Sequence, residues 1–221
     1  MHDKYEIKLT GDDTKTIWLP KLNESYHSIH GAWNEGQHVF IVNGISNCEA
    51  TPIRALELGF GTGLNALLCA LYAIKNKSLL YYHSLERYPL GQAIHKQMHY
   101  ENKLDADFSN LYKLIYQASW EEEVHIDPFF NLKKMNKDFF DFKSEELYDI
   151  ILYDAFAPDK QSELWTKQAL ERAFDLIKEG GFLTTYCAKG SFKRMLKTIG
   201  FHVETLDGPP GKREMTRAWR L

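Results

Sequence analysis

The sequence predicts an α/β protein built on a mostly parallel β-sheet, and three observations support this fold class. Apolar runs with the composition of buried strands alternate along the chain with amphipathic helical patterns, an order typical of parallel sheets. A glycine-rich turn at residues 59–63 joins the first strong strand to a helix. Acidic residues follow several of the predicted strands. Because ligands of open α/β sheets bind outside the carboxyl ends of the strands, these acids predict a small-molecule site there.

The composition indicates one globular domain. The chain has 221 residues, of which 44% are hydrophobic and 26% charged. We expect a single domain over residues 1–221, with a β-rich N-terminal extension (1–50) and the sheet core (51–221). No apolar run is long enough to span a membrane, and the polar N-terminus does not read as a secretory signal. Three widely spaced cysteines indicate reduced thiols in the cytoplasm, and neither they nor the histidines show metal-binding spacing.

The N-terminal extension contains two predicted strands. Thr16–Leu19 and His38–Val42 are apolar and β-branched and are bounded by proline, glycine or an Asn-Gly pair. The polar and aromatic segment between them, residues 26–35, is expected to be a connecting loop. Its role, in binding or in structure, stays open at this stage.

The glycine-rich turn predicts a ligand-binding loop. A strand over residues 53–58 leads into Gly59-Phe60-Gly61-Thr62-Gly63, and a helix is expected over about residues 63–76. Glycines permit positive φ and close approach of a ligand, and the free N–H groups that open a helix favour polar groups. Glu57 stands just before the turn, which suits a ligand with an ammonium group. The spacing differs from the G-x-G-x-x-G fingerprint, which argues against a nicotinamide oxidoreductase.

Two further strands each carry an acid near their carboxyl ends. Residues 79–85 predict a buried strand followed by Glu86, and an acid in this position can accept hydrogen bonds from ribose hydroxyls. The alternative is a surface Glu paired with Arg87. Residues 89–120 predict a broken helical segment and residues 120–124 a solvated end. Residues 130–135 predict a half-buried strand followed by Asp138, which either meets an adenine amino group or is an ordinary turn residue.

The last third of the chain completes the alternating pattern. Residues 148–153 form the clearest buried strand, and Asp154 follows it directly. A helix is expected from residue 162 to about 178, closed by Gly180-Gly181, and then a strand at 182–187. A second helix ends at Gly200. Strands at 201–206 and 215–221 flank a Gly/Pro-rich loop and are expected to form an antiparallel edge of the sheet.

Several motifs together resemble a known family. The pattern E-x-G-x-G-x-G resembles the first motif of the Rossmann-like S-adenosylmethionine (SAM) methyltransferases. The segments ELGFGTG, SLERYPL, DAFAPDKQSELWT, TYCAKG and GPPGKREM, spread from Tyr26 to Met215, resemble the methyltransferase half of the bifunctional bacterial enzyme that makes 5-methylaminomethyl-2-thiouridine at the tRNA wobble position. They resemble the stand-alone methyltransferase relatives of that enzyme still more closely. The resemblance implies a Rossmann-like SAM-dependent methyltransferase sheet with an antiparallel C-terminal edge strand.

The same resemblance implies a reaction, a cofactor and partners. We expect SAM-dependent N-methylation of the 5-aminomethyl group of 5-aminomethyl-2-thiouridine in tRNA, in the cytoplasm. No flavin-dependent oxidase half accompanies the motifs, so a separate enzyme is expected to install the aminomethyl group. Two alternatives remain, an aminopropyltransferase of the spermidine synthase type and a non-catalytic RNA-binding module on a methyltransferase scaffold.

The expected site residues divide into catalytic, cofactor-binding and substrate-binding groups. Asp154 is the expected catalytic residue, which would hold the acceptor amine and help to remove its proton. The expected cofactor-binding residues, from the glycine-rich loop and the strand ends, are Glu57, Gly59, Phe60, Gly61, Gly63, Asn65, Glu86 and Asp138. The expected substrate-binding residues are Tyr26 and Phe156, to stack on the base, and Lys212 and Arg213, to contact phosphates, with Lys160, Lys189, Lys193 and Arg194 as weaker candidates.

The distribution of charge agrees with a polyanionic partner. The whole chain carries a net charge of −3, yet residues 186–221 contain eight Lys or Arg against three Asp or Glu. Such asymmetry indicates nucleic acid binding, although a solvated helix face produces part of it.

Overall fold

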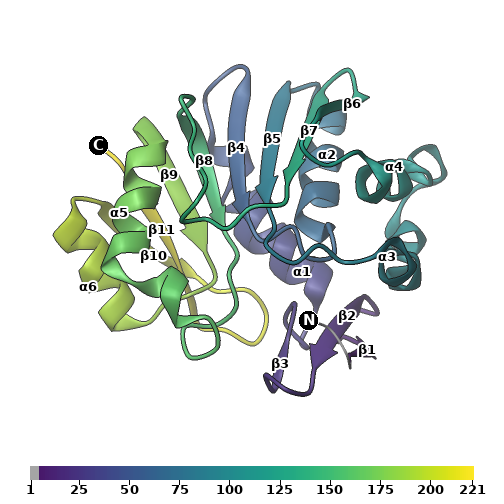
Figure 1. The fold of residues 1–221 in the computed structure, drawn as a ribbon, viewed down its shortest axis with the longest axis horizontal. Coiled ribbons are helices and arrows are strands. Elements are labelled where there is room, and N and C mark those ends of the chain that lie inside the picture. Colours follow the sequence, from purple (N-terminus) through teal and green to yellow (C-terminus); the bar gives the residue numbers. More distant parts are fainter. Residues whose placement is uncertain (1–4) are drawn as a thin grey trace.

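The protein is described by a computed structural model that covers residues 5–221. The first four residues of the predicted N-terminal extension lie outside the described residues. The centre of the fold is an eight-stranded sheet (Figure 1). In spatial order its strands are β10 (His202–Asp207), β11 (Glu214–Trp219), β9 (Ile177–Thr185), β8 (Tyr148–Tyr153), β4 (Ile53–Leu58), β5 (Leu80–Leu85), β7 (Phe130–Met135) and β6 (Glu123–Asp127).

The sheet confirms the predicted fold class. The five central strands, from β9 to β7, run parallel. The predicted C-terminal edge is present, because β10 pairs with β11 and β11 with β9 in antiparallel register. The order reverses between β4 and β8, since the chain moves outward through β5 and β7 and then returns to the other side of β4. Such a switch point opens a crevice at the strand ends.

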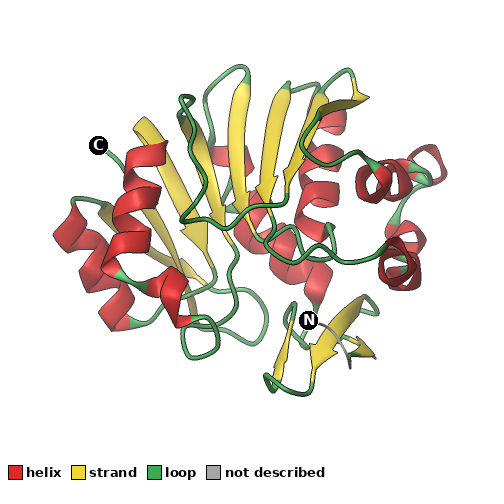
Figure 2. Ribbon diagram, viewed as in Figure 1, coloured by secondary structure: helices red, strands yellow, loops and turns green. Residues whose placement is uncertain are grey.

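Helices cover both faces of the sheet (Figure 2). One face carries α1 (Ala32–Gly36), α2 (Leu64–Asn76), α3 (Gln92–Met98) and α4 (Leu111–Gln117), and the other carries α5 (Lys167–Leu176) and α6 (Gly190–Ile199). Strand β8 shows why both faces are apolar. Ile150 and Leu152 belong to one buried cluster, and Ile151 and Tyr153 belong to the other. None of the helices among residues 5–221 is long and apolar enough to cross a membrane.

The N-terminal segment forms a small sheet of its own and then turns helical. Strands β1 (Glu6–Leu9), β2 (Lys15–Leu19) and β3 (Glu24–Ser25) lie beyond the carboxyl ends of the central strands (Figure 1). The predicted strand at residues 16–19 is confirmed as part of β2. The predicted strand at 38–42 is wrong, because the π-helix η1 (Gln37–Val42) occupies this stretch and η2 (Ile45–Asn47) follows it. Within residues 5–50, the strands are therefore confined to the first half.

The β-branched run at 38–42 was misleading for a physical reason. Val39, Phe40 and Ile41 are consecutive and all buried, whereas a half-buried strand would turn alternate residues to solvent. Short apolar runs do not distinguish a buried helix from a strand by periodicity. Packing decides the outcome here, and the Val39 carbonyl accepts a hydrogen bond from Thr184 Oγ1 of β9 at 3.1 Å.

Two other element boundaries differ from the predictions. Gly180-Gly181 does not close a helix, because α5 ends at Leu176 and β9 begins at Ile177. Tyr148 pairs with Ile177 and Ile150 with Phe182, so the glycine pair lies in a bulge of β9, where Gly180 has φ of 79°. The predicted solvated end at residues 120–124 is also wrong in part. It leads into the edge strand β6, whose weakly alternating, exposed residues gave no clear strand pattern.

Candidate active site

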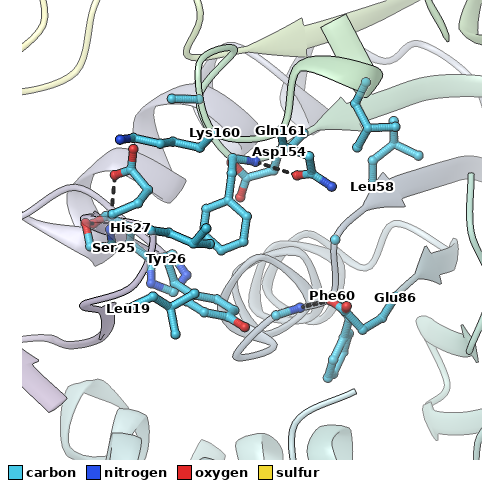
Figure 3. Close-up of a pocket in the computed structure, with 18 of the residues that line it drawn as sticks. Leu19, Ser25, Tyr26, His27, Leu58, Phe60, Glu86, Asp154, Lys160 and Gln161 are labelled. Carbon is cyan, nitrogen blue, oxygen red and sulfur yellow. Dashed lines mark hydrogen bonds between the residues drawn. The ribbon is translucent and has the colours of Figure 1, made fainter. Parts of the chain in front are cut away.

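A cavity of about 820 Å³ opens at the carboxyl ends of the parallel strands (Figure 3). The cavity lies between the core, the N-terminal segment and the loop that joins β10 to β11. Most of the expected site residues line it, namely Tyr26, Gly59, Phe60, Gly61, Asn65, Glu86, Asp138, Asp154, Phe156 and Lys212. Glu57, Gly63 and Arg213 are not among its lining residues.

The glycine-rich loop has the backbone conformation that its sequence requires. Gly59 has φ of 93°, and a Cβ there would lie 3.2 Å from the carbonyl oxygen of Asp154. Gly63, with φ of 77°, precedes the first residue of α2, and a Cβ there would meet the Phe60 ring at 2.9 Å. The loop therefore passes close to β8 on one side and packs on its own aromatic residue.

Glu57 lies behind this loop and not in the cavity wall. Its side chain is fully buried, and Glu57 Oε2 accepts a hydrogen bond from Ser84 Oγ at 2.5 Å. Burial raises the pKa of Glu57 to about 8. Glu57 Oε1 is buried without a hydrogen-bond partner among the described residues. The structure therefore does not bring Glu57 to the lining surface, where direct contact with a cationic ligand would need it.

Glu86 and Asp138 stand at the carboxyl ends of neighbouring strands, as expected. Glu86 Oε2 accepts a hydrogen bond from Gly61 N–H at 3.0 Å (Figure 3). Glu86 Oε1 accepts one from Tyr88 N–H at 2.8 Å. Asp138 Oδ1 accepts from Phe140 N–H at 2.8 Å, and Oδ2 pairs with Arg87 at 2.9 Å. Glu86 thus ties its strand end to the glycine-rich loop, whereas Asp138 already forms a turn and an ion pair.

Asp154 lies across the switch point from the glycine-rich loop. Asp154 Oδ2 accepts a hydrogen bond from Asn65 Nδ2, in the first turn of α2, at 2.7 Å. Burial raises the pKa of Asp154 to about 7, and the negative charge of Glu35 adds to this shift. A carboxyl group that titrates near neutral pH can accept and release a proton under working conditions. This property distinguishes Asp154 from ordinary surface carboxylates.

Two aromatic residues from distant parts of the chain meet at the cavity. The rings of Tyr26 and Phe156 pack edge to face with their centroids 5.1 Å apart. Tyr26 also lies against the glycine-rich loop, because a Cβ on Gly61 would be 3.1 Å from its ring. Figure 3 shows Tyr26 and His27 entering from the N-terminal segment, with Asp154 and Gln161 on the opposite side. The predicted stacking pair is therefore assembled in one place.

Lys212 does not lie on the outer surface, where a phosphate contact was expected. Lys212 Nζ forms an ion pair with Glu35 Oε1 at 2.5 Å and lies 3.9 Å from the ring centroid of Tyr186. Arg213, the next residue, is exposed. The two cations of the loop are thus separated, one inside the cavity and one outside it.

Glu35 and Tyr186 are site residues that sequence reasoning missed. Glu35 belongs to α1, within the stretch expected to be a connector, and its side chain is buried in the cavity wall. Tyr186 follows β9 directly, and its hydroxyl donates to the Ala155 carbonyl at 2.8 Å. The sequence position of Tyr186 could have indicated a site residue, because it follows a parallel strand in the same way as Glu86 and Asp154. Glu35 had no such signal, since helix α1 was not expected.

His27 is a further missed residue, and it joins the small N-terminal sheet to the glycine-rich loop. His27 Nδ1 lies 3.0 Å from Thr16 Oγ1, and Nε2 lies 3.3 Å from Thr62 Oγ1. Burial lowers the pKa of His27 to about 4, so the ring is neutral at neutral pH. A neutral imidazole can therefore bridge the Thr16 and Thr62 hydroxyls.

The residues of the cavity fit the cofactor that the motif resemblance implies. The glycine-rich loop leaves room for a ligand against its backbone, and Glu86 offers carboxylate oxygens to hydroxyl groups. Apolar side chains of Leu58, Leu85 and Phe139 line the same region and suit the flat face of a base.

Comparisons with proteins of known sequence agree with this interpretation. The chain is 29% identical over 212 residues to the tRNA 5-methylaminomethyl-2-thiouridine biosynthesis bifunctional protein MnmC of Campylobacter hominis, an alignment that covers 92% of this chain and 31% of that protein. It is 30% identical over 218 residues to the MnmC protein of Actinobacillus pleuropneumoniae, covering 88% and 30%. The chain therefore spans about a third of the length of these relatives.

Solved structures show the same fold. MnmC2 from Aquifex aeolicus superposes with a TM-score of 0.78 at 23% identity, over 99% of this chain and 70% of that chain. SAM-bound CalS10 from Micromonospora echinaspora, an amino pentose methyltransferase, gives a TM-score of 0.52 at 11% identity, over 86% and 92%. The family model described as S-adenosyl-L-methionine-dependent methyltransferase matches residues 95–221, which is more than half of the sequence. The chain therefore belongs to this family of SAM-dependent methyltransferases, as its motifs predicted.

Proposed function

We propose that this methyltransferase N-methylates the 5-aminomethyl group of 5-aminomethyl-2-thiouridine at the wobble position of tRNA, giving 5-methylaminomethyl-2-thiouridine. Two facts support the proposal. The relatives described above are named for biosynthesis of this nucleoside. The observation that carries it is the position of Asp154, a carboxyl group with a pKa of about 7 that faces the same cavity as the glycine-rich loop.

The cofactor is assigned to the side of the cavity formed by the glycine-rich loop. Gly59, Phe60, Gly61 and Asn65 would hold its methionyl part, with Gly63 shaping the turn and Glu57 supporting it from behind. Glu86 would accept hydrogen bonds from the ribose hydroxyls, and Asp138 lies where the adenine amino group is expected. When bound, SAM supplies a methyl group that is already activated by its sulfonium.

Asp154 prepares the acceptor amine. A primary alkylamine is mostly protonated at neutral pH, like lysine with its reference pKa of about 10.4, and its nitrogen is a nucleophile only after the proton has left. Asp154 is placed to accept this proton, and Asn65 donates a hydrogen bond that fixes the orientation of the carboxyl group. Once Asp154 has passed this proton to solvent, its carboxylate stabilises the positive charge that the nitrogen carries after methylation.

The acceptor base is assigned to the other side of the cavity. A wobble uridine must leave the stack of the anticodon loop to reach an enclosed site, and extruded bases are generally held between aromatic or apolar side chains. Tyr26 and Phe156 provide aromatic rings beside Asp154. We assign the exposed Arg213 to tRNA phosphates, together with the weaker candidates Lys189 and Arg194, next to and on α6. Of the other two weaker candidates, Lys160 lines the cavity and Lys193 forms an ion pair with Glu214 at 2.7 Å.

The proposed substrate fixes two further expectations. We propose that a separate enzyme installs the aminomethyl group before this reaction, since the relatives described above are named as bifunctional proteins. The proposed place of action is the cytoplasm, where tRNA is modified. Both expectations depend on the assignment of the acceptor.

Methyl transfer to defined tRNA pools tests the proposal. Purified protein is supplied with SAM labelled in its methyl group and with tRNA from cells whose wobble uridines carry the aminomethyl group, or from cells that lack it. Digested nucleosides are then separated and weighed. We expect label in the first pool only, in 5-methylaminomethyl-2-thiouridine. Label in neither pool, from protein that binds SAM, would contradict the proposal, and polyamines would be the next acceptors to test.

A further inference from the structure

The ammonium group of Lys212 occupies an unusual place for a lysine of a glycine- and proline-rich loop. It reaches into the cavity, where Nζ meets Glu35 Oε1 at 2.5 Å and the ring of Tyr186 at 3.9 Å from the centroid. About a third of the Lys212 side chain is exposed, and only 11% of the Glu35 side chain. A carboxylate together with an aromatic face is an arrangement that proteins use to recognise alkylammonium ligands.

The groups around Lys212 Nζ are held by contacts that do not involve Lys212. Glu35 Oε2 accepts a hydrogen bond from Ser28 N–H at 2.8 Å. The Tyr186 hydroxyl donates to the Ala155 carbonyl at 2.8 Å, and Asp154 is fixed by Asn65. The arrangement is thus preorganised, and it would persist if the ammonium group moved out.

Two carboxyl groups serve this part of the cavity. Glu35 and Asp154 are close enough to influence each other, because the charge of Glu35 raises the pKa of Asp154 while that of Lys212 lowers it. Lys212 pairs directly with Glu35. An acceptor that arrives as an ammonium ion brings the same chemical group, a primary amine on a methylene carbon, into the same electrostatic environment.

We propose that Glu35, Asp154 and the face of Tyr186 form the ammonium subsite for the acceptor, and that Lys212 occupies this subsite until the aminomethyl group displaces it. This inference rests on the proposed function. It assigns Glu35 and Tyr186 to recognition of the acceptor and makes Lys212 a resident competitor. A displaced Lys212 remains on the same loop as the exposed Arg213, where a second cation favours a phosphate-rich partner.

Competition between Lys212 and the aminomethyl group can be measured as a change in tRNA preference. Dissociation constants are determined in the presence of S-adenosylhomocysteine for the same tRNA with and without the aminomethyl group. The preference is the ratio of these two constants, in which the contribution of the phosphate contacts cancels. In Lys212→Met the preference for the aminomethyl tRNA is expected to rise by about tenfold. This is the gain in affinity expected when a competing group that occupies the subsite about nine-tenths of the time is removed. In Glu35→Gln the preference is expected to fall below that of the wild type.

A preference that is unchanged or reduced in Lys212→Met would overturn the exchange. Because removing Lys212 leaves Glu35 unpaired and can impair folding, a second measurement uses the wild-type protein. The side-chain ammonium signal of Lys212 is followed by NMR, with Lys212→Arg to assign it, during titration with 5-aminomethyluridine or 5-methyluridine. We expect the amine alone to shift it toward the position of a solvated lysine. No shift, or equal binding of the two nucleosides, would contradict the subsite.

The two hypotheses fail in different ways. Wild-type protein that does not methylate aminomethyl tRNA would refute the proposed function itself. Methylation with an unchanged preference in Lys212→Met would refute only the displacement of Lys212.

Discussion

Glu86 connects the end of β5 to the glycine-rich loop through one hydrogen bond, donated by Gly61 N–H. Its two carboxylate oxygens accept from Gly61 N–H and Tyr88 N–H, at 3.0 and 2.8 Å. A carboxylate has further acceptor positions beyond these two bonds, and the residue lines the cavity. Glu86 therefore both shapes the loop and remains available to ligand hydroxyls.

Replacing Glu86 tests this double role. Glu86→Ala is expected to raise the dissociation constant for SAM by about tenfold or more, because hydrogen bonds to a charged acceptor are worth roughly 1.5–3 kcal/mol. Isothermal titration calorimetry measures the change. The control is Glu122→Ala, an exposed glutamate outside the cavity. Equal affinity in the two variants would remove Glu86 from cofactor binding.

Glu57 predicts a pH dependence of stability. Its pKa is about 8 in the folded protein, against an ordinary pKa of 4.5 for a glutamate, so between these pH values the folded state binds more protons than the unfolded state. The free energy of unfolding must then decrease as pH rises through this window. Glu57→Gln removes the titration, and we expect the variant to gain on the order of 1–3 kcal/mol relative to wild type between about pH 5 and pH 8.5.

Urea denaturation of both proteins at the two pH values measures this difference. Asp154 also has a raised pKa, so its titration likewise lowers the free energy of unfolding as pH rises. The comparison between wild type and Glu57→Gln isolates Glu57, because Asp154 is present in both. A constant difference across the pH range would show that Glu57 does not titrate in this window.

At the scale of elements, the glycine-rich loop is supported from beneath by a buried cation. Lys134 of β7 is fully buried, and its Nζ donates to the carbonyls of Ile115 and Tyr116 in α4, at 3.2 and 3.0 Å. The same Nζ lies 5.0 Å from the ring centroid of Phe60 and 4.9 Å from that of Trp120. Strand β7, helix α4 and the loop are thus joined through one side chain.

Removing this cation should affect both stability and the loop. Lys134→Met leaves two buried carbonyls unpaired, which is expected to cost about 2–4 kcal/mol of unfolding free energy. Because Phe60 loses a contact, SAM affinity should fall as well. Lys133→Met, the preceding and partly exposed residue of β7, is the matched control. A loss of stability with unchanged SAM affinity would limit Lys134 to a structural role.

Element prediction succeeded where the local pattern and the tertiary environment agree. The strands that are buried on both faces, such as β8, read as continuous apolar runs and were predicted correctly. The π-helix at residues 37–42 and the bulge at Gly180 were missed, because packing around Phe40 and the register of β9 decide them. Glycine occurs both at helix ends and at strand bulges, so Gly180-Gly181 did not by itself distinguish the two.

At the scale of the whole molecule, the cavity is closed by the two ends of the chain. Tyr26 and Glu35 come from the N-terminal segment, and Lys212 comes from the last hairpin. Ile17 and Leu19 of the small sheet belong to the same buried cluster as α2, and His27 bridges the sheet to the glycine-rich loop. We infer that residues 1–221 form a single domain in which the N-terminal extension completes the site.

The positive charge of the C-terminal region is expected to act on tRNA binding by the whole molecule. Arg213→Ala is expected to weaken tRNA binding similarly for all sequences and to reduce the slope of log affinity against log salt by about 1, the effect of losing one phosphate contact. Filter binding at several salt concentrations measures the slope. Lys113→Ala is the control, an exposed lysine on α4, which packs near the opposite edge of the sheet. Identical slopes for the two variants would exclude Arg213 from the tRNA interface.

The candidate site was predictable to the extent that residues follow strand ends. Asp154 and Glu86 were identified because parallel strands bring their carboxyl ends together. Glu57 was expected in the cavity, yet the strand end turns it into the interior. The pairing of Lys212 with Glu35 joins residues 177 positions apart, and no local pattern records such a contact.

The most direct test of the account is the rate of methyl transfer in a single turnover by wild type and Asp154→Asn, measured beside the dissociation constant for SAM. We predict a decrease in rate of about 10²–10⁴, typical of losing a group that moves a proton, with nearly unchanged SAM affinity. An Asp154→Asn enzyme that transfers the methyl group at the wild-type rate would contradict the claim that Asp154 prepares the acceptor amine.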